Sequence, residues 1–190
     1  MKRIMVALIL AVSFASGLLA ESSSFHLEVG SFYGTRQVID SDIKNVYGSG
    51  MVYFPFLAVT WKGIILGAGY EGGYSKSGKI GLYQEPTTLK VNGFEVYVGY
   101  ALRIKSLAPY FRVGYGSYSY KQTIDSPYLS DFKVDGTKST FSGSAGIKFY
   151  PIKTLFLVIE ARYVPLKVKP LEEEVDLGGL RLEGGIGFTI

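Results

Sequence analysis

Hydrophobic and polar side chains alternate along most of this chain with a period of two. The pattern is clearest in residues 180–190, where Leu, Leu, Gly, Ile, Phe and Ile take the even positions and Arg, Glu, Gly, Gly and Thr the odd ones. Successive side chains of a β-strand point to opposite faces. Roughly nine to eleven residues of a tilted strand cross the hydrocarbon of a bilayer. The pattern therefore predicts a membrane-crossing strand with one apolar face.

Seven more segments show the same alternation. The eight predicted strands cover about residues 25–34, 47–54, 62–74, 89–102, 109–121, 141–149, 155–163 and 180–190. Four long polar connections, at about 35–45, 75–88, 122–138 and 166–175, alternate with three short ones. Pro55 is expected to end the second strand because proline cannot donate to a ladder. The apolar run 56–61 leaves the start of the third strand ambiguous and is compatible with a bulge. No helical periodicity follows the N-terminal segment.

An even number of antiparallel strands, with connections that alternate in length, predicts an all-β fold. We expect an eight-stranded antiparallel up-and-down transmembrane β-barrel with both termini at one end. A last strand with a complete apolar face needs partners on both edges, and pairing it with the first strand provides them.

Glycine indicates which face of the barrel points outward. The face opposite the apolar one is largely glycine, which contributes little to a solvated surface but suits a narrow lumen. Aromatic residues stand near both ends of the strands, as in the interfacial girdles of membrane barrels. We expect Tyr53, Phe54, Phe149 and Tyr150 near the short turns and Tyr33, Tyr70, Tyr74, Tyr115 and Tyr163 near the long loops. The apolar face is therefore predicted to point outward; a soluble barrel with the inverse arrangement is the alternative.

The N-terminus has the order of a secretory signal peptide. Lys2 and Arg3 precede an apolar run over residues 4–14, and small residues follow up to Ala20. We expect a signal peptide over 1–20 and a barrel domain over 21–190; an uncleaved anchor is the alternative. Without 1–20 the chain has 18 bases and 16 acids, a net charge of +2. That charge gives no reason to expect nucleic-acid binding, and the absence of cysteine excludes disulfides and a lipidated cysteine.

On these residues the chain resembles the small eight-stranded outer-membrane barrels, the OmpA-type transmembrane domain and its OmpX-like and opacity-like relatives. The ending Phe188-Thr189-Ile190 resembles the terminal strand that the outer-membrane assembly machinery reads, with the usual terminal aromatic two residues early. The resemblance implies an outer-membrane location with periplasmic termini. It also implies outer-membrane lipids, including lipopolysaccharide, and the assembly machinery as partners. It does not extend to the peptidoglycan-binding domain that follows OmpA-type barrels.

Charged residues on the inward face form a near-balanced set. The predicted interior network comprises Glu28, Glu71, Glu95, Arg112, Lys148, Glu160, Arg162, Arg181 and Glu183. Strand positions predict the pairs Arg162–Glu183, Glu95–Arg112 and Glu28–Arg181. Because an unpaired buried charge is costly, such a set favours a salt-bridged plug. A narrow porin-like channel for small solutes or ions is the alternative, since charged rings also tune pores.

No residue pattern identifies catalysis, a cofactor or a metal. His26 is the only histidine, and no serine stands with it as in outer-membrane lipid-modifying enzymes that resemble this fold. Asp40, Asp42 and Asn45 have the spacing of part of a calcium loop, but its glycine and distal glutamate are missing. Basic residues on the loops and strand tops, among them Arg36, are expected to be solvated, or to bind lipopolysaccharide phosphates. The predicted function is a non-enzymatic structural or surface-interaction role through the extracellular loops, with the channel and a lipid-modifying enzyme as alternatives.

Overall fold

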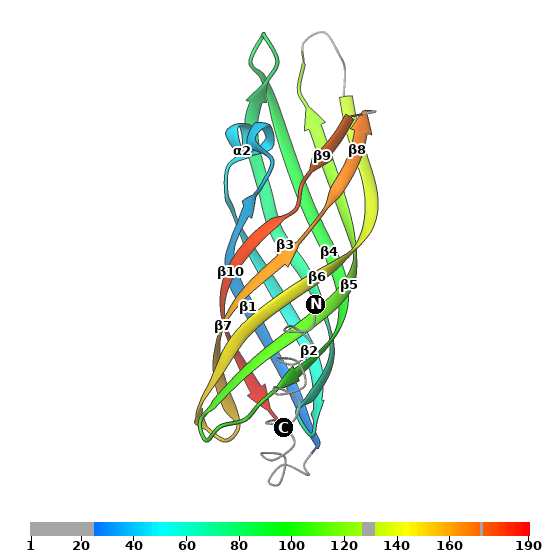
Figure 1. Cartoon of the computed structure of the whole chain (residues 1–190). Coiled ribbons are helices and arrows are strands. Elements are labelled where there is room, and N and C mark those ends of the chain that lie inside the picture. Colours follow the sequence, from blue (N-terminus) through cyan, green and yellow to red (C-terminus); the bar gives the residue numbers. More distant parts are fainter. Residues whose placement is uncertain (1–24, 127–131, 172) are drawn as a thin grey trace, which may run out of the picture.

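Eight antiparallel strands close into one barrel, and consecutive strands are neighbours around it. A computed structural model describes residues 25–126, 132–171 and 173–190, and the barrel order is β1-β10-β7-β6-β5-β4-β3-β2 (Figure 1). This confirms the predicted eight-stranded up-and-down barrel. The predicted signal peptide lies outside the described residues and stays a prediction. No helix in the described part of the chain is long and apolar enough to span a membrane.

Seven of the eight barrel strands are longer than the alternation predicted, and a second small sheet is separate from the barrel sheet. The barrel strands are β1 Phe25–Val38, β2 Gly50–Trp61, β3 Ile64–Ile80, β4 Glu85–Ala101, β5 Leu107–Ile124, β6 Phe132–Ile152, β7 Leu155–Val164 and β10 Gly179–Thr189. Helix α2, Ser41–Tyr47, follows β1, and strands β8 (Lys167–Leu171) and β9 (Glu173–Asp176) form a two-stranded sheet before β10.

The apolar face of the barrel points outward. Val96, Val113 and Leu157 are 48%, 51% and 45% exposed, while Glu95, Arg112 and Glu160 on the same strands are at most 4% exposed. A water-soluble barrel would bury the first set and expose the second. The arrangement is that of a barrel whose outer surface contacts lipid.

Aromatic side chains mark an upper edge of the lipid-facing band. On neighbouring strands Tyr33 pairs with Tyr53, Tyr70 with Phe94, and Tyr115 with Phe141, so these outward rings form a girdle around the long-loop side. Counted inclusively, nine residues separate this girdle from a lower apolar belt in β1 (Phe25 to Tyr33), β2 (Tyr53 to Trp61) and β6 (Phe141 to Phe149). That length suits a bilayer crossing, for which about nine to eleven tilted residues are needed.

Four of the aromatic positions differ from the prediction. Phe54, Tyr74 and Tyr150 point into the barrel and are 1%, 1% and 8% exposed. Tyr53 points outward but belongs to the long-loop girdle, because β2 continues six residues beyond Pro55 before the chain turns. Tyr74 lies inward because the β3–β4 register shifts between Glu71 and Tyr74, which reverses the facing of the residues that follow.

The second strand does not end at Pro55. Tyr53 pairs with Gly72 and Phe56 with Gly69 in one register, so the β2–β3 ladder is interrupted near the proline and then resumes. The turn lies at Lys62 and Gly63, whose φ angles of 49° and 84° are those of a two-residue hairpin turn. The apolar run 56–61 is therefore the end of β2 and contains no register shift.

Lys62 occupies a backbone conformation that favours asparagine or glycine. We expect Lys62→Asn to raise the free energy of unfolding by about 0.5–1 kcal/mol, because asparagine tolerates the left-handed region at lower cost. The midpoint of heat-induced loss of the fast-migrating folded band on gels measures this. Lys153→Asn is the matched control, because Lys153 is also an exposed turn lysine but has a negative φ. Equal effects of the two substitutions would contradict the explanation.

The segments predicted as long loops are mostly ordered structure. Strands β3 and β4 extend to Ile80 and from Glu85, and β5 and β6 include residues 122–124 and 132–138. In these segments the strands continue to pair beyond the membrane, and most of their side chains on both faces are polar. The alternation of apolar and polar residues that identifies a half-buried strand is therefore missing. Helix α2 was also not predicted, because seven residues are too few to show a helical period. Asp40 caps it by accepting from the backbone N–H groups of Asp42 and Ile43.

Candidate functional site: the interior of the barrel and its outer rim

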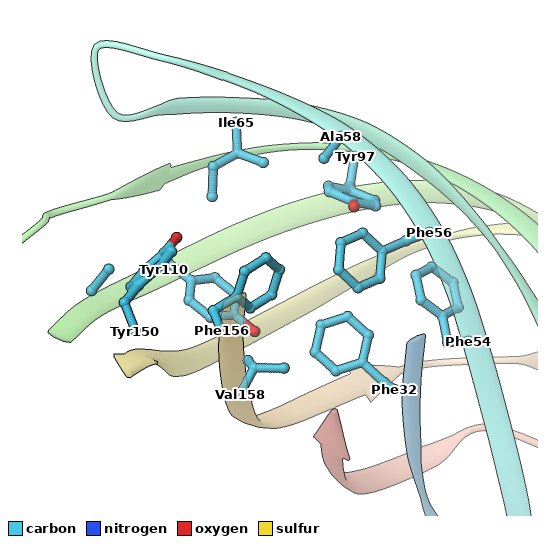
Figure 2. Close-up of a cluster of buried hydrophobic side chains, with 11 residues drawn as sticks. Phe32, Phe54, Phe56, Ala58, Ile65, Tyr97, Tyr110, Tyr150, Phe156 and Val158 are labelled. Atoms are coloured by element: carbon cyan, nitrogen blue, oxygen red, sulfur yellow. The ribbon is translucent and has the colours of Figure 1, made fainter. Parts of the chain in front are cut away.

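A layer of aromatic rings occupies the barrel near the short turns. Figure 2 shows these rings converging from several strands; the layer consists of Phe32, Phe54, Phe56, Ala58, Ile65, Tyr97, Ala108, Tyr110, Tyr150, Phe156 and Val158. Inward glycines make room for it. A Cβ on Gly69 would lie 2.3 Å from the Phe54 ring, and one on Gly187 would lie 2.3 Å from the Phe156 ring. The inward glycines therefore provide space for large rings, in a lumen that is filled by side chains.

A layer of buried charge lies next to the aromatic one. All nine residues of the predicted network are at most 4% exposed. Their ion pairs are Lys148–Glu28, Arg112–Glu160 (2.5 Å), Arg162–Glu95 (2.5 Å) and Arg181–Glu71. Glu183 makes no ion pair within the described chain; it lies near Arg162 and Arg181 and opposite Glu160.

None of the three predicted pairs forms. The strand registers are the reason. Arg181 lies directly opposite Arg162, and Glu183 lies opposite Glu160. Arg112 lies opposite Gly99, four residues from Glu95, and Glu28 lies opposite Thr189, eight residues from Arg181. Like charges on adjacent strands disfavour each other. The long side chains therefore pair with strands that are not their neighbours: Arg162 of β7 with Glu95 of β4, and Lys148 of β6 with Glu28 of β1. All nine side chains of the predicted network lie inside the barrel, but only closure of the barrel determined which of them meet.

Glu95 is the most completely coordinated carboxylate of the layer. Its Oε2 atom accepts hydrogen bonds from the Tyr118 hydroxyl at 2.8 Å, the Ser142 hydroxyl at 2.8 Å and the Arg162 guanidinium at 2.5 Å. Gly114 lies beside it, and a Cβ there would stand 2.4 Å from Glu95 Oε1. Four strands therefore hold this one carboxylate in place.

Arg36 belongs to the interior and was missed. It is 0% exposed, pairs with Glu71 at 3.3 Å and donates to the backbone carbonyl of Leu177. The sequence did contain a sign of this. Arg36 has an even number, like the inward Glu28 of the same strand, but it lies beyond the point where the first strand was predicted to end. With Arg36 the buried set contains five acids and five bases, so its formal charge is balanced.

The charged and aromatic layers are in direct contact. The Arg112 guanidinium carbon lies 4.4 Å from the centre of the Tyr97 ring and 5.0 Å from that of Phe32. Arg162 lies 4.2 Å from the centre of the Phe54 ring. These cation–π contacts give the faces of both guanidinium groups aromatic partners, in addition to the carboxylates that their edges contact.

A second apolar layer closes the long-loop end. It consists of Val38, Tyr47, Val52, Tyr74, Leu89, Val91, Tyr118, Val164, Leu166, Val168 and Leu177. Tyr47 comes from α2, and its hydroxyl lies 2.8 Å from the Thr87 hydroxyl and accepts from Gln122 at 2.7 Å. Burial raises the pKa of the Tyr47 phenol. The helix is thus attached to the barrel wall and packs on this apolar layer.

At the long-loop end, the outer surface carries a polar pocket of about 500 Å³ between β6 and the β8–β9 sheet. Lys138, Lys167 and Lys169 line it together with Glu174, and Lys167 pairs with Glu174 at 3.1 Å. This exposed pair raises the pKa of Lys167 and lowers that of Glu174 through their mutual hydrogen bond.

The other candidate residues have structural positions. His26 is half-buried in β1 and pairs in register with Thr60. Asp40 and Asp42 belong to the start of α2, where Asp40 is the helix cap. Among the residues that the structure describes, no group of three or more His, Cys, Asp or Glu side chains could hold a metal ion.

A closed eight-stranded barrel that turns apolar side chains to its surface and ion pairs to its axis defines a transmembrane β-barrel of the outer-membrane class. The family model for the outer membrane protein beta-barrel domain matches residues 6–188. The chain therefore belongs to this family of outer-membrane proteins. A comparison with curated protein sequences gave no match.

Solved structures of similar fold are outer-membrane barrels. The neisserial surface protein A has a TM-score of 0.60 at 13% identity, with 87% of this chain and 97% of that chain covered. The N-terminal barrel of Pseudomonas aeruginosa OprF has a TM-score of 0.55 at 16% identity, with 87% and 97% covered. Ail of Yersinia pestis, in complex with the heparin analogue sucrose octasulfate, has a TM-score of 0.56 at 13% identity, with 87% and 98% covered. At these identities the likeness concerns the fold.

Proposed function

We propose that the protein is a non-enzymatic outer-membrane barrel that serves as a closed scaffold, and that its extramembrane part is a surface for interaction. The observation that carries this proposal is the layered interior. Aromatic rings, a charge-balanced set of ion pairs and a second apolar layer follow one another along the axis. A path for water or ions would have to cross all three layers.

The extramembrane part has the features of a recognition surface. Strands β3 to β6 rise beyond the aromatic girdle, and α2 and the β8–β9 sheet stand beside them (Figure 1). These elements carry charges of both signs around the polar pocket. Ail, a barrel of similar fold, is in complex with a sulfated sugar analogue. A sulfated or phosphorylated carbohydrate is therefore a reasonable first ligand to test on the pocket lysines.

Lipopolysaccharide and the assembly machinery are proposed as the constitutive partners. Lys90 of β4 and Lys121 of β5 are exposed, directly opposite each other and above the girdle. Like charges in this position destabilise a sheet unless an anion lies between them. Phosphates of the outer leaflet would supply that anion.

We expect the folded protein to be silent in planar bilayers. The interior layers leave no continuous polar path, so discrete conductance steps should be absent under an applied voltage. The channel alternative is supported instead if regular steps occur and Glu95→Gln or Arg112→Ala changes their size. The same preparation should show the heat-dependent gel shift of a folded barrel, so that silence is not confused with misfolding.

We propose that the long-loop end faces the cell exterior and both termini face the periplasm. Because the chain has no cysteine, single-cysteine variants report position without background. Leu82→Cys, at a 90% exposed position between β3 and β4, should react with a membrane-impermeant maleimide on intact cells. Lys153→Cys, between β6 and β7, should react only after the outer membrane is opened. The reverse pattern of labelling would invert the proposed orientation.

A further inference from the structure

Every charged side chain on the three short turns is basic. The turns at residues 62–63, 102–106 and 153–154 carry Lys62, Arg103, Lys105 and Lys153, all exposed, and contain no acid. We call these four residues the basic rim. In the described chain, the exposed carboxylate side chains Asp42, Asp125, Asp135 and Glu174 stand at the opposite, long-loop end. Among the residues that the structure describes, the charged side chains exposed at this end are therefore all basic.

The basic rim extends around most of the barrel end. Its turns join β2 to β3, β4 to β5, and β6 to β7, so at this end of the barrel every second pair of neighbouring strands from β2 to β7 is connected by a basic turn. The remaining position is taken by the ends of β1 and β10, which are joined by a hydrogen bond from the Ile190 N–H to the Leu27 carbonyl. The cations therefore occupy three of the four positions around this end of the barrel.

Two of the four cations stand where the backbone does not favour lysine. Lys62 and Lys105 have φ angles of 49° and 56°, in the left-handed region where glycine or asparagine is less strained. Residues in this backbone region cluster at ligand-binding and other functional sites, although Gln84 between β3 and β4 has the same φ of 56° outside the rim. Within the described chain the basic rim forms no ion pair: Lys62 lies over the Trp61 ring at 5.1 Å, and Arg103 over the Tyr150 ring at 4.2 Å.

The rim directly borders the lipid-facing band. Trp61 and Ile152 are outward and 51% and 58% exposed, each one residue from a rim lysine. Since these apolar side chains contact the acyl chains, the cations next to them lie at the depth of the headgroups. A basic patch at that depth attracts anionic lipid, and the attraction falls with increasing salt.

We propose that the basic rim binds the phosphate groups of anionic phospholipids in the leaflet that the short turns face. The proposal rests on the seating of the barrel in the membrane given under the proposed function. It adds a lipid preference at the end opposite the loops. Peptidoglycan is a second possible anionic partner. It is less consistent with the position of the basic rim, because Trp61 in the lower apolar belt holds the rim at the bilayer surface.

Trp61 is the only tryptophan of the chain and lies beside Lys62, so its fluorescence reports the lipid at the rim. The folded protein is reconstituted in equimolar phosphatidylcholine and phosphatidylglycerol, with either one or the other lipid brominated. At low salt we expect phosphatidylglycerol to be preferred around Trp61 by about fivefold or more. A single lysine or arginine near an anionic membrane surface contributes about 1 kcal/mol, which corresponds to about fivefold. High salt should reduce the preference toward equality.

Two variants test the assignment. Arg103→Gln/Lys105→Gln/Lys153→Gln retains Lys62 and hence the surroundings of Trp61, and should lower the preference to the contribution of Lys62 alone. The matched control, Lys44→Gln/Lys79→Gln/Lys133→Gln, removes the same charge from the long-loop end and should retain it. Equal quenching by both lipids in the unaltered protein, or equal loss in both variants, would overturn the proposal.

The experiment also separates failures of different origin. If neither brominated lipid quenches Trp61, the barrel is not seated in the bilayer, and the proposed function itself is wrong. If detergent-folded protein sediments with purified peptidoglycan through the rim residues while vesicles show no lipid preference, the rim binds the cell wall and the lipid assignment is wrong.

Discussion

Glu95→Ala should destabilise the folded barrel by about 3–5 kcal/mol, the largest loss we expect from a single substitution. Removal of this carboxylate leaves Arg162, which is 1% exposed, without its ion-pair partner. It also deprives the hydroxyls of Tyr118 and Ser142 of their acceptor. Urea titration in lipid vesicles, followed by the emission of Trp61, measures the free energy of unfolding.

A double variant separates the cost of an orphaned charge from that of a cavity. Glu95→Leu/Arg162→Met removes both members of the pair and should recover most of the lost stability, since apolar replacements of buried ion pairs are often neutral. Glu174→Ala removes the acid of an exposed pair and should leave the unfolding midpoint unchanged. If Glu95→Ala is as stable as the unaltered protein, the charged layer does not hold the barrel together.

Ile159→Arg should destabilise the barrel in lipid by about 2–4 kcal/mol. Ile159 is at the centre of β7 and is 76% exposed, so its side chain contacts little of its own protein. An arginine there would carry its charge into the middle of the hydrocarbon. A barrel whose outer surface met water would accept the same substitution readily.

Ser119→Arg is the control for Ile159→Arg. Ser119 of β5 is also exposed on the outer face but lies four residues beyond the girdle tyrosine Tyr115, above the lipid. Arginine at this position should have no measurable effect on the same urea titration. Equal losses at the two positions would mean that depth in the bilayer does not matter, and the outward apolar face would need another explanation.

The closed interior also gives a physical reason for the glycine content of the chain. At several inward positions a Cβ would meet an aromatic ring or a charged side chain of the neighbouring strand, as at Gly69, Gly114 and Gly187. Small residues beside large ones let a narrow eight-stranded barrel fill its own lumen. The glycines are thus part of the packing of the plug, even though they contribute no side chain to it.

The sequence by itself determined the class of fold, the direction of the apolar face and the nine predicted members of the interior charge network. These features follow from the two-residue period of a strand, which is local. Only the tertiary structure decided which charges pair, because the partners of Glu95 and Glu28 come from strands 67 and 120 residues away. It also decided the facing of Tyr74 and the membership of Arg36, because a register shift and a ladder above the membrane leave no trace in the apolar pattern.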